Sequence, residues 1–157
     1  MTVAREIMEK QVVTVTADSS LLSVYRLFAE TDISGAPVVE QTGEVVGVVS
    51  WRDLLRAVNE DHDKSVDDLH FYSNDSTLGY REFLSEGEEI EERLARQTVS
   101  EVMTTDVITV PVDATVEQMA GLMVEHRIHR VLVVDEKREE GPLVGIVSVL
   151  DLVALLR

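Results

Sequence analysis

Short runs of β-branched residues alternate along this chain with apolar residues at helical spacing, and the alternation occurs twice. Val12 to Thr16 and Val107 to Val110 are the first such runs, and each is predicted to form a strand. Behind each run, apolar residues at positions i, i+3, i+4 and i+7 predict a helix with one buried face. Those positions hold Leu21, Val24, Tyr25 and Phe28 in the first copy, and Val116, Met119, Ala120 and Met123 in the second.

The order of predicted elements is the same in both copies. Ser20 and Thr115 are the expected start residues of the two helices, and Thr115 with Gln118 is predicted to form a capping box. Two strands joined by a short turn come next, and a second helix ends each copy. These strands are Ala36 to Glu40 and Val45 to Ser50 in the first copy, and Val131 to Asp135 and Leu143 to Ser148 in the second.

The turn from the last strand into the last helix has a similar sequence in both copies. A glycine lies in the strand, a serine follows three residues later, and an aspartate three beyond that: Gly47, Ser50 and Asp53, then Gly145, Ser148 and Asp151. Serine is predicted at the N-cap, so one interpretation is a capping box without any ligand. The other is a ligand site, because a carboxylate offers two acceptor oxygens to neighbouring ribose hydroxyls. The strand glycine would permit close approach of a ligand or of another backbone.

The chain therefore divides into repeats at 3–58 and 98–157, joined by a dissimilar segment at 59–97. This middle segment is rich in acids, which favours a solvated connector. It also contains Phe71, Tyr72, Tyr80 and Phe83, and a disordered linker would be poor in aromatic residues. We expect part of it to dock on the body, with a helix within Arg81 to Arg96 that contacts the body through Phe83, Ile90 and Leu94.

Composition narrows the classes of partner. The 157 residues carry a formal charge of −16, which opposes binding to nucleic acid or to an anionic membrane surface. There is no cysteine for disulfide or thiolate chemistry. No run of about 18 apolar residues could span a membrane, and the first residues lack the layout of a signal peptide. A cytoplasmic protein is the expectation.

The doubled unit resembles a tandem pair of CBS domains, the arrangement called a Bateman module. The resemblance rests on the two Gly-x-x-Ser-x-x-Asp endings, on Ser34 to Val39 before the first hairpin, and on the similar repeat starts at Arg5 to Met8 and Ser100 to Met103. It implies an α+β fold of two pseudo-symmetric repeats, each strand-helix-strand-strand-helix, packed sheet to sheet. It also implies a homodimer of such pairs and a regulatory role.

The resemblance further implies clefts that bind an adenosine-containing ligand: AMP, ADP, ATP or S-adenosylmethionine, with magnesium as an optional companion. The aspartates would hold the ribose, and the serines would help to hold ribose or phosphate. The complete predicted set of ligand-binding residues is Ser50, Asp53, Ser148, Asp151, Arg130, His129, Ala36, Pro37, Thr14 and Thr109.

His126 to Asp135 is similar to the equivalent segment in the gamma regulatory subunit of AMP-activated protein kinase, in which a His-Arg pair contacts nucleotide phosphates. Arg130 is the corresponding candidate here, since a guanidinium pairs with phosphate oxygens and keeps its charge; a surface ion pair is the alternative. His126 and His129 are a poor metal pair without further ligands. The first repeat has Ser34 and Gly35 at the positions of His129 and Arg130, so it lacks one phosphate contact.

Three classes of function remain open on these residues. The first is a stand-alone regulatory module that binds an adenosine compound and signals to a protein partner. The second is an interaction module without a small ligand. An enzyme is the third and ranks lowest, because the chain has no Gly-x-x-x-x-Gly-Lys loop, no Gly-x-Gly-x-x-Gly and no recognisable catalytic assembly or metal cluster.

Overall fold

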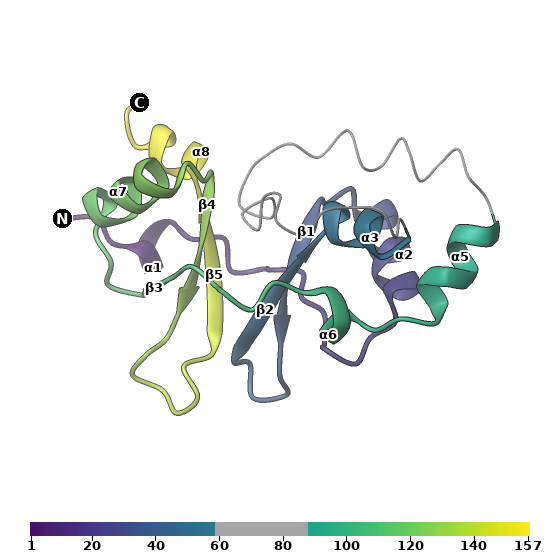
Figure 1. Ribbon diagram of the computed structural model, residues 1–157. Helices are drawn as coiled ribbons and strands as arrows, with labels where there is room; N and C mark the ends of the chain where they lie inside the picture. Colours follow the sequence, from purple (N-terminus) through teal and green to yellow (C-terminus); the bar gives the residue numbers. More distant parts are fainter. Residues whose placement is uncertain (59–87) are drawn as a thin grey trace.

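The computed structural model of the protein describes residues 1–58 and 88–157. Figure 1 shows two β-hairpins side by side at the centre, with helices on the outer side of each. The two sheets face each other, because Val48 of the first hairpin belongs to the hydrophobic core of the second repeat. This architecture confirms the predicted α+β fold of two repeats packed through their sheets.

The first repeat contains α2 (Leu21–Thr31), β1 (Gly35–Val39), β2 (Val45–Ser50) and α3 (Trp51–Val58). Ser20 caps α2 as predicted, with its side chain accepting a hydrogen bond from the Ser23 N–H. The strands β1 and β2 are antiparallel, and Gly35 lies opposite Ser50. Gly35 and the N-terminus of α3 are therefore at the same end of the sheet.

The second repeat contains β3 (Thr109–Pro111), α7 (Val116–His126), β4 (Arg130–Val134), β5 (Leu143–Ser148) and α8 (Val149–Ala154). Thr115 and Gln118 form the predicted capping box at α7. In the sheet order β3-β4-β5, β3 is parallel to β4 and β4 is antiparallel to β5. Arg130 lies opposite Ser148, as Gly35 lies opposite Ser50.

The first predicted strand of each repeat is shorter than expected, and proline explains why the two differ. In the second repeat the Leu132 N–H donates to the Ile108 carbonyl, which extends the pairing at the start of β3. Pro37 occupies the position of Leu132 in the first repeat and has no N–H to donate. Pairing there is reduced to one bridge between Val15 and Val38.

The leading segments of the two repeats are exchanged between them. Helix α1 (Ala4–Ile7) begins the first repeat but packs on the second, where the Ala4 N–H donates to the Ala114 carbonyl at 2.9 Å. Helix α6 (Val99–Val102) begins the second repeat but packs on the first, where the Val99 N–H donates to the Ser19 carbonyl at 2.9 Å. Each repeat thus completes the other, which the sequence pattern did not predict.

The two strand glycines make room for this exchange. A Cβ on Gly145 would lie 2.5 Å from the Met8 Sδ, and a Cβ on Gly47 would lie 2.8 Å from the Met103 Sδ and 2.9 Å from the Thr104 carbonyl oxygen. The expected close approach is therefore real. Its partner is the leading segment of the other repeat, which binds the halves together.

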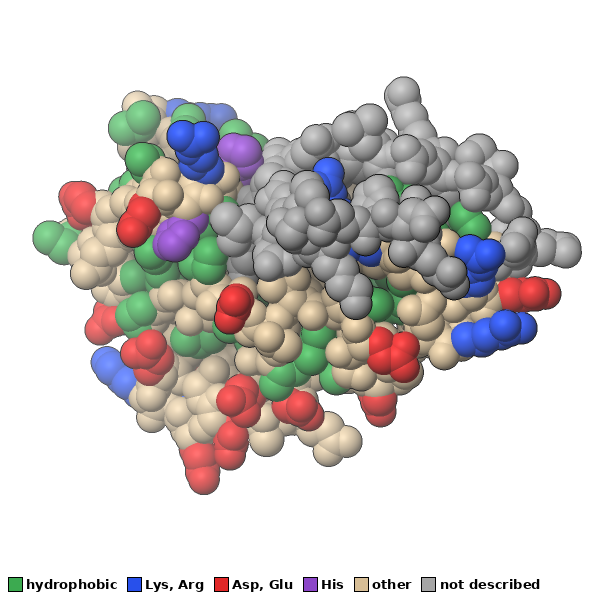
Figure 2. Space-filling model, in the orientation of Figure 1, with side chains coloured by type: hydrophobic (Ala, Val, Ile, Leu, Met, Phe, Trp, Pro, Cys, Tyr) green, Lys and Arg blue, Asp and Glu red, His purple; other side chains and the backbone are tan. Residues whose placement is uncertain are grey.

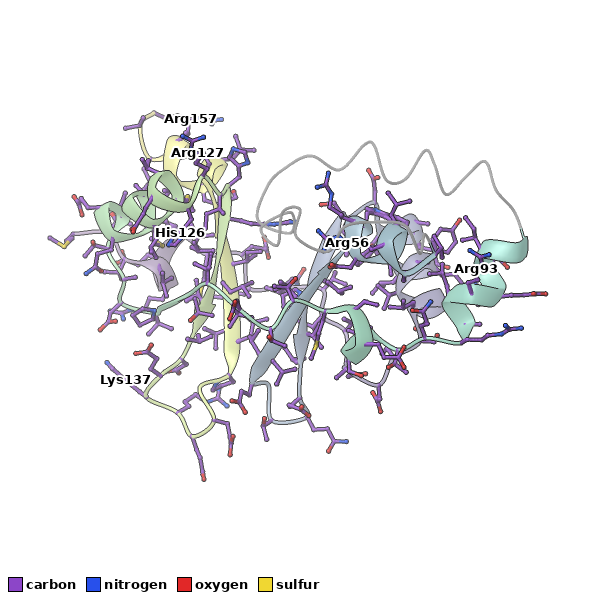
Figure 3. The ribbon with its side chains drawn as sticks, in the orientation of Figure 1. Arg56, Arg93, His126, Arg127, Lys137 and Arg157 are labelled. Atoms are coloured by element: carbon purple, nitrogen blue, oxygen red, sulfur yellow. The ribbon has the colours of Figure 1, made fainter. Side chains whose placement is uncertain are left out.

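Helix α5 (Glu88–Ala95) covers one side of the first repeat, against α2 and α3. Ile90 and Leu94 are buried in the first core, and the Arg93 Nη1 donates to the Val58 carbonyl at 2.7 Å (Figure 3). This confirms that part of the middle segment docks on the body through a helix. Residues 81–87 of the predicted helix, with Phe83, and the aromatic residues Phe71, Tyr72 and Tyr80 lie outside the described residues.

Candidate functional site

The aspartate of the first motif accepts two hydrogen bonds from the serine that precedes its helix. The Ser50 N–H donates to the Asp53 Oδ2 at 2.8 Å, and the Ser50 hydroxyl donates to the same oxygen at 3.3 Å. Asp53 is the third residue of α3, so its carboxylate stabilises the first turn.

The second motif has the same geometry. The Ser148 N–H and hydroxyl donate to the Asp151 Oδ2 at 2.8 and 3.1 Å, and the Asp151 N–H returns a bond to the serine Oγ at 3.3 Å. These contacts make a complete capping box at α8. At α3 the two bonds from Ser50 to the Asp53 Oδ2 are present, so the motif has a structural role in both repeats. Each aspartate uses only its Oδ2 in this role.

The remaining oxygens of the two aspartates have different surroundings. The Asp53 Oδ1 lies 3.8 Å from the Arg56 Nη1, and the two side chains are only 8% and 14% exposed. Figure 3 shows Arg56 on α3, beside the first sheet. In the second repeat Ala154 stands at the position of Arg56, Asp151 is half-buried, and its Oδ1 has no partner among the described residues. Asp151 therefore has spare acceptor capacity, whereas Asp53 is held in an ion pair.

Sequence reasoning did not single out Arg56. Its spacing of three from Asp53 on a predicted helix was the available signal, since side chains at i and i+3 are neighbours on a helix. The burial of the pair was not available from the sequence. Together with Ser34 and Ser50, Asp53 makes up the buried polar and charged side chains of the described part of the chain.

The beginnings of β1 and β4 lie next to these motifs. The Trp51 N–H donates to the Ser34 carbonyl at 3.0 Å, and the Val149 N–H donates to the His129 carbonyl at 2.8 Å. His129 is exposed and Arg130 is half-buried. The Arg130 Nη2 donates to the Ser34 Oγ at 3.4 Å, so its guanidinium crosses from the second repeat to the first.

The other predicted ligand residues are spread over different environments. Ala36 and Pro37 are buried within β1, and Ala36 is part of the first core. Thr14 is exposed ahead of the Val15 bridge. Thr109 lines a pocket of about 480 Å³ between β3 and α7, with Glu117 and Glu125 at its edge.

A second pocket, of about 550 Å³, lies at the hairpin end of the first sheet. Its lining includes the carboxylates of Asp18, Glu40, Glu44 and Glu140. Acidic side chains are visible along the lower edge of the molecule in Figure 2, on the side of the hairpin turns. Within residues 1–58 and 88–157, no three or more His, Asp or Glu side chains are grouped so that they could hold a metal ion.

No helix among the described residues is both long and apolar enough to cross a membrane. The fold thus defines a two-repeat α+β module whose helix starts and strand starts meet at one end of each sheet.

Comparison with known proteins gives the family. The CBS domain model matches residues 4–60 and 99–157, and the chain belongs to the CBS domain family. CBS domains are in general regulatory modules rather than catalytic ones.

One relative is the uncharacterized protein MJ1426 of Methanocaldococcus jannaschii, which is 37% identical over 97% of this chain and 89% of its own. Two similar solved structures contain ligands. CBSX2 in complex with AMP has a TM-score of 0.68 at 23% identity, covering 99% of this chain and 96% of its own. The CBS domain pair of MJ0100, in complex with 5-methylthioadenosine and S-adenosyl-L-methionine, has a TM-score of 0.62 at 22% identity and the same coverage. At these identities the likeness to the solved structures establishes the fold.

Proposed function

We propose that this protein is a regulatory module that binds an adenosine-containing ligand, AMP, ADP, ATP or S-adenosylmethionine, and signals its presence to a protein partner. The observation that carries the proposal is the state of Asp151. This half-buried carboxylate is oriented by its capping bonds, and its Oδ1 has no partner among the described residues. A fixed carboxylate with a spare oxygen suits a pair of ribose hydroxyls.

The neighbouring side chains supply the remaining functions of such a site. Ser148 adds a hydroxyl beside the carboxylate, and Arg130 and His129 add donors for phosphate at the start of β4. The solved CBS domain pairs that contain AMP or S-adenosyl-L-methionine support this class of ligand. In the first repeat, Ser50 and Asp53 would take the equivalent roles, with Ala36, Pro37 and Thr14 nearby. Thr109 at the start of β3 would be the counterpart of Thr14 in the second repeat.

The net charge of the chain predicts the order of affinity among the candidate ligands. Each added phosphate has to approach a chain with a formal charge of −16. We therefore expect AMP or the cationic S-adenosylmethionine to bind more tightly than ATP in the absence of magnesium, and magnesium to matter for ATP alone.

Calorimetric titration with AMP, ADP, ATP and S-adenosylmethionine tests the proposal. Asp151→Ala should weaken binding at least about 10-fold, the loss of one or two hydrogen bonds to a charged acceptor. Glu136→Gln, which removes a negative charge from an exposed turn, is the matched control and should leave affinity unchanged. The absence of heat with every ligand at several salt concentrations would refute the proposal.

The proposal includes a homodimer, supported by an apolar surface on the second repeat. Val124 of α7, Leu150 and Val153 of α8, and Leu156 just after α8 are exposed, between 51% and 85%. Hydrophobic side chains are visible at the upper left of Figure 2, over these helices. Exposed apolar groups of this kind mark interfaces. Analytical ultracentrifugation should give a dimer that Leu150→Lys converts to a monomer.

A module without a small ligand is the second candidate. It is favoured by the capping bonds, which give both aspartates a structural role in the absence of any ligand. In that case the double variant with Asp53→Ala and Asp151→Ala should retain its protein partner in a pull-down. Loss of the partner, together with loss of ligand binding, would favour the sensor.

A further inference from the structure

The two repeats share their sequence pattern, but only the second has a cationic side chain at the start of its β-hairpin. Arg130 begins β4 opposite Ser148, and the equivalent residue at the start of β1 is Gly35, opposite Ser50. The first repeat therefore contributes no side chain at the position from which Arg130 extends.

The Arg130 side chain reaches into the first repeat. Its Nη2 donates to the Ser34 Oγ at 3.4 Å, while its backbone stays in register with Ser148. The guanidinium thus links the strand starts of the two repeats.

Ser34 places that guanidinium next to the first motif. The Ser34 carbonyl accepts the Trp51 N–H at the start of α3, one residue after Ser50. Ser34, Ser50 and Asp53 are the polar and charged side chains that are buried among the described residues. Arg130 therefore ends beside the buried polar cluster of the first repeat.

Building on the proposed function, we propose that Arg130 is a single phosphate-binding cation shared by the two adenosine sites. A guanidinium that pairs with a phosphate in one site is withdrawn from the other, because one side chain cannot be in both places. The protein then binds one phosphate-bearing adenosine ligand tightly and a second one weakly. Phosphate-free adenosine compounds do not need the cation and bind the two sites independently.

The experiment is calorimetric titration of the full chain with AMP and, separately, with 5-methylthioadenosine, which has no phosphate. With AMP we expect two steps whose affinities differ by about 10- to 100-fold, the usual value of a hydrogen bond to a charged partner. With 5-methylthioadenosine we expect the two sites to differ by much less.

Variants separate the hydrogen-bond donors of the Arg130 guanidinium from its positive charge and from the net charge of the chain. Arg130→Gln should abolish the difference between the AMP steps by weakening the tight one about 10- to 100-fold, and should change the affinity for 5-methylthioadenosine less than about 2-fold. Arg130→Lys, which keeps the charge but loses the paired donors, should give an intermediate loss. Arg138→Gln in the exposed hairpin turn makes the same change in net charge and should alter neither ligand.

The converse variant adds the missing cation. Gly35→Arg gives β1 the residue that β4 has, and a folded variant should bind two AMP molecules with similar affinity. Far-ultraviolet circular dichroism checks its folding, and the Arg130 variants decide the question if it does not fold.

The outcomes distinguish this inference from the function on which it rests. Equal losses for AMP and 5-methylthioadenosine in Arg130→Gln, or two equal AMP sites in the unmodified protein, would overturn the shared cation and leave the sensor intact. Failure of AMP to bind would overturn this inference alone. Absence of binding with AMP, ADP, ATP and S-adenosylmethionine alike would overturn the proposed function as well.

Discussion

The two repeats show how one Ser-x-x-Asp capping motif gives different chemistry beside different neighbouring residues. Asp53 and Asp151 make nearly identical capping contacts at 2.8 Å with the serine N–H. Asp53 is buried beside Arg56, whereas Asp151 is half-buried and keeps an oxygen without a partner among the described residues. The motif fixes the carboxylate, and its environment decides whether it stabilises the fold or is available to a ligand.

The largest expected difference between the repeats is in the free energy of unfolding that is lost when these aspartates are removed. Asp53→Ala removes a buried carboxylate that both caps α3 and pairs with Arg56, which costs about 3–5 kcal/mol, whereas Asp151→Ala loses a helix cap worth about 1 kcal/mol. Urea unfolding followed by the fluorescence of Trp51, the one tryptophan of the chain, measures both. Equal losses would mean that the burial of the first site has no energetic consequence.

Shortening an apolar side chain on the outer helix of the first repeat should destabilise the fold more than the same change on the outer helix of the second repeat. Leu94 is fully buried where α5 covers the first core, so Leu94→Ala should lower the free energy of unfolding by about 2–5 kcal/mol. Val124 on α7 is 79% exposed, and Val124→Ala should change that free energy by no more than about 0.5 kcal/mol in dilute monomer. A loss below about 1 kcal/mol for Leu94→Ala would show that α5 is not docked in solution.

Substitution by alanine at two glycines of the second repeat should change the free energy of unfolding in opposite directions. Gly145→Ala places a methyl group against Met8 and should destabilise the fold by about 1–3 kcal/mol. Gly121 is exposed within α7 with nothing within 4 Å of an added Cβ, so Gly121→Ala should stabilise by about 1 kcal/mol.

A double-mutant cycle shows whether the Gly145 effect passes through the exchanged segment. Adding Met8→Ala to Gly145→Ala removes the Sδ and Cγ contacts, and the two losses should then sum to less than their separate values. Additive losses would contradict the proposed contact between the leading segment and the second sheet.

The smallest expected effect concerns the helix caps. Thr115→Ala should cost about 1 kcal/mol, because it removes one half of a reciprocal box with Gln118. Gln118→Ala should cost a few tenths more than Ser23→Ala, its counterpart in α2, since Ser23 makes no return bond to the Ser20 N–H in the described residues. Thermal unfolding of the matched pair checks this order.

Much of the fold was predictable because local patterns specify it. Apolar spacing located α2 and α7, the capping residues Ser20 and Thr115 marked their starts, and the doubled motif located the turn from strand into helix. The shortened first strand was also open to prediction, because Pro37 lacks the N–H that Leu132 supplies in the second repeat.

The exchange of α1 and α6 was not predictable in the same way. Short helices of four residues have no periodicity to identify the surface they cover. Gly145 and Gly47 signalled that something approaches closely, but not that Met8 and Met103 do so from the opposite repeat.

The sequence by itself determined that the chain is a doubled α+β unit and which residues start its helices, because hydrophobic periodicity and capping act over a few neighbouring residues. Only the tertiary structure decided that Asp53 is buried against Arg56 while Asp151 is not, and that Arg130 reaches Ser34 in the other repeat. Burial and contacts between distant residues depend on how the two halves pack.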